Sequence, residues 1–129
     1  MANEEIIIKL AGLEERAKQI EQNIQIVEEN SIDLQRLQEG LEEIKGSKGK
    51  EILAPIGRGI FVKAKLDSEE FLTDIGGRTF VKKDGDDINK MIEENIGKLA
   101  ELKAELFREL EELNEELEDT LGSVEQREN

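Results

Sequence analysis

A heptad repeat in the first third of the chain constrains the fold most. Its members alternate at spacings of four and three residues and are apolar except for one serine: Ile6, Leu10, Leu13, Ala17, Ile20, Ile24, Val27, Ser31 and Leu34. A mean period of 3.5 residues is that of a seam along which one helix supercoils left-handedly around another. The repeat therefore predicts a long helix with a partner helix. Beyond it, Leu37, Leu41 and Ile44 move the stripe to a neighbouring face, which predicts a second partner there.

A second apolar stripe occupies the last third of the chain. It consists of Ile88, Met91, Ile92, Ile96, Leu99, Leu102, Leu106, Leu110, Leu113, Leu117, Leu121 and Val124. From Leu99 onward its spacings are 3, 4, 4, 3, 4, 4 and 3. This eleven-residue rhythm predicts a helix that is straighter, or locally unwound, compared with the first. Asp84 is a suitable N-cap for it, with Asp87 as a capping-box-like acid.

The segment between the stripes has the pattern of strands. Gly46–Lys50 ends the first helix, and two strand–turn–strand units follow it. The expected strands are 52–56, 60–66, 71–75 and 79–83. Pro55 cannot donate a ladder hydrogen bond, so its position should be an edge or a bulge. Two β-hairpins therefore separate the two helices.

These elements predict an α+β fold with three parts: an N-terminal coiled-coil helix (1–45), two β-hairpins (46–84), and a C-terminal coiled-coil helix with a frayed tail (85–129). Two arms of similar length around a short insert can pair only antiparallel. Two hairpins contain too little apolar area to be stable alone and have open edges. We therefore expect the hairpins to assemble between subunits into a sheet, or into a closed β-barrel.

Composition excludes most catalytic chemistry. The chain has no His and no Cys, which removes imidazole bases, thiolate nucleophiles and ordinary zinc sites. Carboxylate pairs such as Glu14–Glu15 and Asp86–Asp87 are explained by solvated helix faces or capping. Gly57–Gly59 lacks the ending of a phosphate loop and is expected to be a hairpin turn. No enzyme activity, metal or cofactor is expected.

The charge is strongly acidic and unevenly distributed. Residues 1–45 hold 11 acids and 5 bases, residues 46–85 hold 6 and 8, and residues 101–129 hold 11 and 3, in a chain of net charge −14. Acidic arms disfavour nucleic-acid binding and suit a basic partner surface, or they only keep the protein in solution. No signal peptide or membrane-spanning stretch is recognisable, so a cytoplasmic location is expected.

The arm ends near the two termini are the candidate binding region. A two-helix seam cannot bury three consecutive isoleucines, so at least one of Ile6–Ile8 should be exposed. Exposed apolar groups on a charged arm suit low-specificity binding of unfolded chains, whereas ordinary seam residues would leave Ile8 as an isolated exposed side chain. The candidate client-binding residues are Ile6, Ile7, Ile8, Leu10, Leu13, Leu117, Leu121 and Val124.

The chain resembles the α-class subunit of archaeal prefoldin over nearly its whole length. The most specific part is residues 49–66, where Pro55-Ile56-Gly57 leads through Gly59 to Phe61-Val62-Lys63-Ala64. Two hairpins instead of one indicate the α class. Arg58 and Arg78 depart from the family pattern, in which the first turn often has Pro and the second a small residue. A related filament-forming prefoldin is therefore the alternative, since edge chemistry decides between closure and open polymerisation.

The resemblance implies a hexamer of two α-class and four β-class subunits with a double β-barrel platform. It also implies capture of non-native proteins at the coiled-coil tips without ATP, and their delivery to a group II chaperonin. The implied assembly residues are Ile52, Leu53, Pro55, Ile56, Ile60, Phe61, Val62, Leu66, Phe71, Ile75, Phe80 and Val81. The implied chaperonin-facing residues are Glu115, Glu116, Glu118 and Asp119.

Overall fold

The computed structural model describes residues 2–128, and the side chains of residues 3–123. In chain order its elements are α1 (Ala2–Ile44), β1 (Glu51–Gly57), β2 (Ile60–Lys65), β3 (Phe71–Asp74), β4 (Phe80–Lys83) and α2 (Gly85–Glu128). The predicted fold of two long helices with two antiparallel hairpins between them is confirmed. The chain divides into two compact units. The first unit holds the residues up to Ile32 and from Gly97 on, and the second holds Asp33–Ile96.

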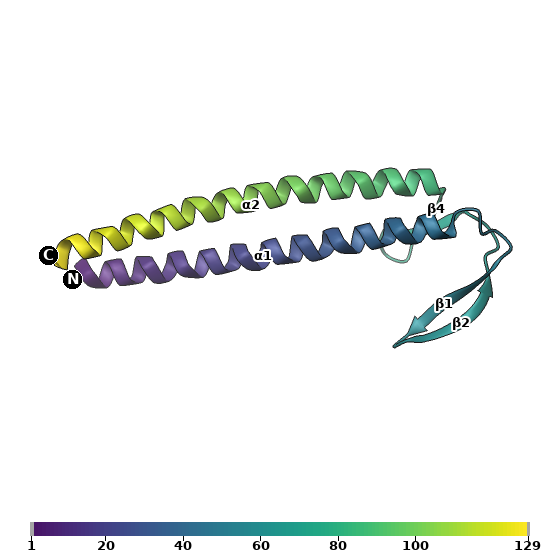
Figure 1. Ribbon diagram of the computed structural model, residues 1–129, viewed down its shortest axis with the longest axis horizontal. Coiled ribbons are helices and arrows are strands. Elements are labelled where there is room, and N and C mark those ends of the chain that lie inside the picture. Colours follow the sequence, from purple (N-terminus) through teal and green to yellow (C-terminus); the bar gives the residue numbers. More distant parts are fainter. Residues whose placement is uncertain (1, 129) are drawn as a thin grey trace. The chain divides into compact units, whose positions relative to one another are not determined.

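The first unit is a two-helix coil in which α1 and α2 lie side by side and run in opposite directions (Figure 1). Its core is a single stripe of apolar side chains. The members from α1 are Leu13, Ala17, Ile20 and Ile24, and those from α2 are Leu113 with the half-buried Leu106, Leu110 and Leu117. Val27, also on the heptad repeat, is buried as well. The heptad seam predicted for α1 is confirmed here.

The eleven-residue rhythm predicted for α2 is wrong in this unit. Thr120 is only 7% exposed, whereas its neighbour Leu121 is 50% exposed. Lys103 is half-buried, whereas Leu102 is exposed. Between Leu99 and Thr120, the buried and half-buried positions are Leu99, Lys103, Leu106, Leu110, Leu113, Leu117 and Thr120, with the regular spacings 4, 3, 4, 3, 4 and 3. Two polar residues thus fill the seam of α2, because packing against the heptads of α1 requires the same period.

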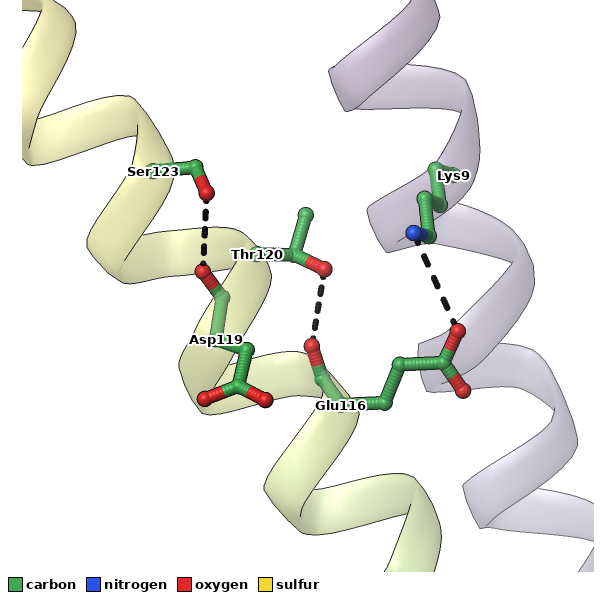
Figure 2. A network of polar contacts seen from close by, with 5 residues as sticks. All are labelled: Lys9, Glu116, Asp119, Thr120 and Ser123. Atoms are coloured by element: carbon green, nitrogen blue, oxygen red, sulfur yellow. Dashed lines mark hydrogen bonds and ion pairs between the residues drawn. The ribbon is translucent and has the colours of Figure 1, made fainter.

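Polar contacts satisfy both of these seam residues. Lys103 Nζ lies 3.1 Å from Glu28 Oε1 on the other helix. Thr120 Oγ1 donates a hydrogen bond of 2.7 Å to the carbonyl oxygen of Glu116 in the preceding turn (Figure 2). Lysine keeps its aliphatic stem in the seam while its ammonium reaches the surface, and threonine places its methyl group there. Neither residue leaves a buried polar atom without a partner.

The core of the second unit is small and includes one hairpin residue. Leu41, Ile88 and Ile92 are buried, and Leu34, Phe71 and Ile96 pack against them. Phe71 at the start of β3 is thus the second partner that the sequence predicts for this end of α1. The stripe does not move to Leu37, however, which is exposed, because the half-buried Gln38 continues the heptad from Leu34 to Leu41.

Defined caps end α1 and begin α2. Gly46 has φ of 77° after α1, and its N–H donates to the Glu69 carboxylate from the link between the hairpins. Asp84 Oδ1 accepts a hydrogen bond of 2.8 Å from the N–H of Asp87. The predicted N-cap is confirmed, and Asp86 and Asp87 place negative charge at the positive end of the helix dipole.

The two hairpins are separate two-stranded sheets, β1–β2 and β3–β4. The register of the first shifts between Pro55 and Gly57, which confirms the bulge expected at proline. The first strand is one residue longer at each end than expected, because Glu51 pairs with Lys65 and Gly57 with Ile60. Ile75 and Thr79 belong to the second turn, where the Ile75 N–H donates to the Thr79 carbonyl at 2.9 Å.

Candidate functional site

The predicted client-binding residues divide into seam and surface groups. Ile7 is 64% exposed and Ile8 72% exposed, and Leu121 on α2 is also exposed. Ile6, Leu10 and Leu117 are half-buried, and Leu13 is buried. The side chain of Val124 lies outside those that the structure describes. The surface group thus consists of Ile7, Ile8 and Leu121, whereas Ile6, Leu10, Leu13 and Leu117 are seam residues.

One ion pair shows which parts of the two helices face each other at this end of the coil. Lys9 Nζ lies 3.8 Å from Glu116 Oε1 (Figure 2). Residues beside Lys9 therefore lie close to the turns of α2 that hold Leu117 and Thr120. The predicted set is brought together in space, although only part of it is accessible. Burial of a large aliphatic side chain is worth about 1.5–3 kcal/mol, so these isoleucines can contribute to binding apolar ligands.

The first hairpin exposes apolar side chains on both of its faces. Paired residues share a face, so Ala54 and Val62 lie on one face and Pro55 and Phe61 on the other. Leu53, on the Pro55 face, is 64% exposed, and Phe61 and Val62 are exposed as well. A sheet that is apolar on both faces needs cover on both sides. The described residues outside this hairpin provide no such cover on either side.

The second hairpin is covered on one face only. Phe71 packs against the helical core, with its ring carbon 3.8 Å from where a Cβ on Gly85 would lie. Leu72 and Phe80 are exposed and belong to the opposite face, because Leu72 pairs with Lys82 and Asp74 with Phe80. Leu72 is absent from the predicted assembly set. Strand alternation beside Phe71 is the signal that could have identified it.

Most of the predicted assembly set is accessible. The exposed members are Leu53, Pro55, Ile56, Ile60, Phe61, Val62, Ile75, Phe80 and Val81, and the half-buried ones are Ile52, Leu66 and Phe71. Each hairpin has two strands, so every strand also presents an open edge. Apolar faces and unpaired edges together form a surface suited to strand pairing with another chain.

Both hairpin turns use a left-handed arginine. Arg58 has φ of 50° and Arg78 has φ of 62°. This region is strained for a residue with a Cβ, and glycine occupies it most easily. Arg58 is the first of the two residues between Gly57 and Ile60, whereas Arg78 is the second of the two between Gly76 and Thr79.

The acidic residues predicted to face a chaperonin lie on the surface of α2. Glu115, Glu116, Glu118 and Asp119 are exposed, and Glu116 is the partner of Lys9. Within the described residues, no group of three acidic, His or Cys side chains is arranged to hold a metal ion. No helix in the described part of the chain is long and apolar enough to cross a membrane.

The family model for prefoldin subunits matches residues 13–129. The chain belongs to the prefoldin family. Its relatives include "Prefoldin subunit alpha" of Methanosphaera stadtmanae, with 27% identity over 90 residues, covering 70% of this chain and 65% of the relative. "Prefoldin subunit alpha 1" of Thermococcus kodakarensis is 32% identical over 95 residues, covering 72% of this chain and 65% of the relative. The matched parts thus span just under two thirds of these two prefoldin subunits.

A third prefoldin relative matches over almost its full length. "Prefoldin subunit alpha" of Methanococcus aeolicus is 27% identical over 95% of this chain and 96% of its own. The identification of an archaeal α-class prefoldin from residues 49–66 and the two hairpins is confirmed. Among solved structures, a chain of the filamentous prefoldin of Methanocaldococcus jannaschii superposes with a TM-score of 0.78, at 20% identity, over 88% of this chain and 95% of that one. That likeness concerns the fold.

Proposed function

We propose that this prefoldin chain is a subunit of an ATP-independent chaperone that holds non-native proteins at the terminal end of its coil. The observation that carries the proposal is the exposure of Ile7 and Ile8 beside each other, at 64% and 72%, outside the heptad seam. Neither side chain is needed for pairing the helices. Their accessible apolar surface suits ligands that expose apolar side chains of their own. No catalysis, metal or cofactor is part of the proposal.

The proposed assembly places this chain with β-class subunits in a hexamer of two α-class and four β-class chains. The first hairpin, apolar on both faces, and the exposed face of the second hairpin support it, because neighbouring hairpins would cover them and pair their edges. An intersubunit β-barrel is the proposed form. The division into helix 1–45, platform 46–84 and helix 85–129 follows from the same proposal.

Delivery to a group II chaperonin and a cytoplasmic location complete the proposal. Glu115, Glu116, Glu118 and Asp119 give this part of α2 four exposed carboxylates within five residues. Such a surface would attract a basic one on a chaperonin, with an affinity that falls as salt is added.

Polar substitution of the surface group tests capture. Ile7→Gln, Ile8→Gln and Leu121→Gln together should weaken suppression of aggregation of a denatured protein severalfold, because three exposed apolar contacts are lost. Light scattering of the denatured protein with the assembled complex measures this effect. Helix content by circular dichroism and complex size should remain unchanged, since none of the three side chains is buried.

A matched variant separates this site from general surface apolarity. Ile26→Gln, Ile32→Gln and Leu37→Gln change three other exposed residues of α1 in the same way. This control should suppress aggregation as the wild type does. Equal activity of all three complexes would show that the terminal end of the coil is not the capture site.

A filament subunit without client activity is the second candidate. The open hairpin edges support it, and the structural neighbour is described as a filamentous prefoldin. Native mass spectrometry and electron microscopy of the purified chain, with and without a β-class subunit, distinguish the two candidates. Polymers that persist with the partner present, and that leave aggregation of a denatured protein unchanged, would favour the filament.

A further inference from the structure

One flank of the α2 seam carries a stripe of three residues, two of them large and apolar, that pairing of the helices does not explain. Phe107, Asn114 and Leu121 are spaced seven residues apart, and each follows a seam residue directly. Residues seven apart lie on nearly the same face of a helix. Phe107 is 48% exposed and Leu121 is also exposed, so two large apolar side chains remain on this flank.

A shallow groove begins at this stripe and runs along α2. Its lining is Phe107, Leu110, Glu111, Asn114, Glu115 and Glu118. The spacings of three and four residues place all six on one side of the helix. The groove therefore combines an aromatic ring and a half-buried leucine at one end with three carboxylates along its length.

The electrostatics of the groove favour a cationic ligand. Its lining holds three carboxylates, those of Glu111, Glu115 and Glu118, and no basic side chain. Lys103 Nζ lies 5.8 Å from the centre of the Phe107 ring and pairs with Glu28, so this charge is neutralised within the coil. Of the four ion pairs found among the described residues, none includes Glu111, Glu115 or Glu118.

We infer that this groove binds basic amphipathic segments of non-native proteins, with an apolar residue of the segment against Phe107 and Leu110 and its lysines or arginines against Glu111, Glu115 and Glu118. The inference rests on the proposed function and names the class of client. Complementary charge selects the segment, and the exposed ring supplies the apolar contact. A folded protein seldom offers an exposed apolar anchor among its basic residues, whereas a non-native chain offers both together.

Direct peptide binding tests the inference. The probe is a fluorescein-labelled amphipathic peptide of leucine and lysine, and its control is the same peptide with glutamate in place of lysine. The full-length chain in its assembled complex should bind the lysine peptide at least tenfold more tightly by fluorescence anisotropy. Added salt should weaken that binding, because the carboxylates contribute through charge.

Three variants locate the binding on the groove. Phe107→Ala should weaken binding of the lysine peptide about tenfold, because it removes the apolar contact. Glu111→Gln, Glu115→Gln and Glu118→Gln together should weaken it to a similar extent and flatten its salt dependence. Asn114→Phe adds an aromatic ring to the groove and should tighten binding severalfold. Every substituted residue is exposed, and the half-buried Leu110 is left unchanged. Circular dichroism should therefore show the wild-type fold.

A variant of equal charge serves as the control. Glu15→Gln, Glu43→Gln and Glu94→Gln remove three exposed carboxylates outside the groove and should change binding less than twofold. Equal weakening by the control set, or equal binding of the glutamate peptide, would overturn the inference. If the groove variants no longer bind a folded group II chaperonin but still bind the lysine peptide as the wild type does, the chaperonin and not a non-native segment occupies the groove. That result would overturn the inference. A wild-type complex that binds the peptide but leaves aggregation unchanged would overturn the proposed function and not the groove.

Discussion

At the scale of single residues, the polar members of the seam explain why counting leucines is an incomplete guide to α2. Leu102 and Leu121 suggested an eleven-residue rhythm, yet both are exposed and the neighbouring Lys103 and Thr120 take the inner positions. Residue type alone does not show this, because the long stem of lysine and the methyl group of threonine pack like apolar groups. The information lies in the partner: α1 keeps strict heptads, so α2 must as well.

Lys103 offers a test of the seam at this scale. Lys103→Leu should stabilise the coil by about 1 kcal/mol, because a leucine buries more apolar surface at the same position. Its ion pair with Glu28 is partly exposed and contributes under about 1 kcal/mol. Thermal unfolding followed by circular dichroism should show a midpoint raised by roughly 3 °C.

Leu102 provides the matching control for that change. Leu102→Lys alters an exposed neighbour and should leave the midpoint within about 1 °C of the wild type, as expected for a surface position. A coil that loses stability with Lys103→Leu, or one that depends on Leu102, would show that the seam follows the eleven-residue rhythm after all.

At the scale of elements, the start of α2 and the register shift of the first hairpin were predictable, because the chemistry of single residues determines them. Asp84 caps α2 as expected, and the register shift falls at Pro55. The strand ends were less predictable. The sequence predicts Thr79 as the first residue of strand 79–83, but its backbone closes the second turn by hydrogen bonds with Gly76 and Ile75. Those bonds depend on the left-handed backbone conformation of Arg78, which cannot be predicted from the presence of an arginine in the sequence.

The cap gives a prediction for the start of α2. Asp84→Ala should destabilise the chain by about 1 kcal/mol, because the N–H of Asp87 loses its acceptor. Asp84→Asn keeps an acceptor oxygen and should cost only a few tenths of a kcal/mol. Urea unfolding of the two variants against the wild type measures both values. An equal loss for alanine and asparagine would mean that the charge of Asp84, and not its hydrogen bond, supports the helix.

At the scale of the whole molecule, the core is limited to what two helices can bury between them. Only one side chain of the described residues, Ile92, is fully buried. Of the three aromatic residues in the hairpins, only Phe71 packs against the helical core, and Phe61 and Phe80 are exposed. Composition and strand edges therefore predict partner subunits, whereas the split of the tip residues into accessible and seam groups requires the register of the two helices.

Assembly through the hairpins can be tested by charge. Leu53→Asp and Leu72→Asp together should prevent formation of the complex, since both side chains are exposed here and would be buried against a neighbour. Sedimentation velocity should show a smaller species, and circular dichroism should show the helix content of the wild type. Ile26→Asp, on the exposed surface of α1, is the control and should leave the size unchanged. A complex of normal size from the double variant would contradict the proposed platform.

The apolar side chains on both faces of the first hairpin have a consequence for a newly synthesised chain before the proposed assembly forms. A newly made copy exposes apolar strand faces and unpaired strand edges, and such surfaces lead proteins to aggregate. In the proposed assembly, production of this chain has to keep pace with that of its partners. An orphan copy would itself be a substrate for the quality-control machinery to which it is proposed to belong.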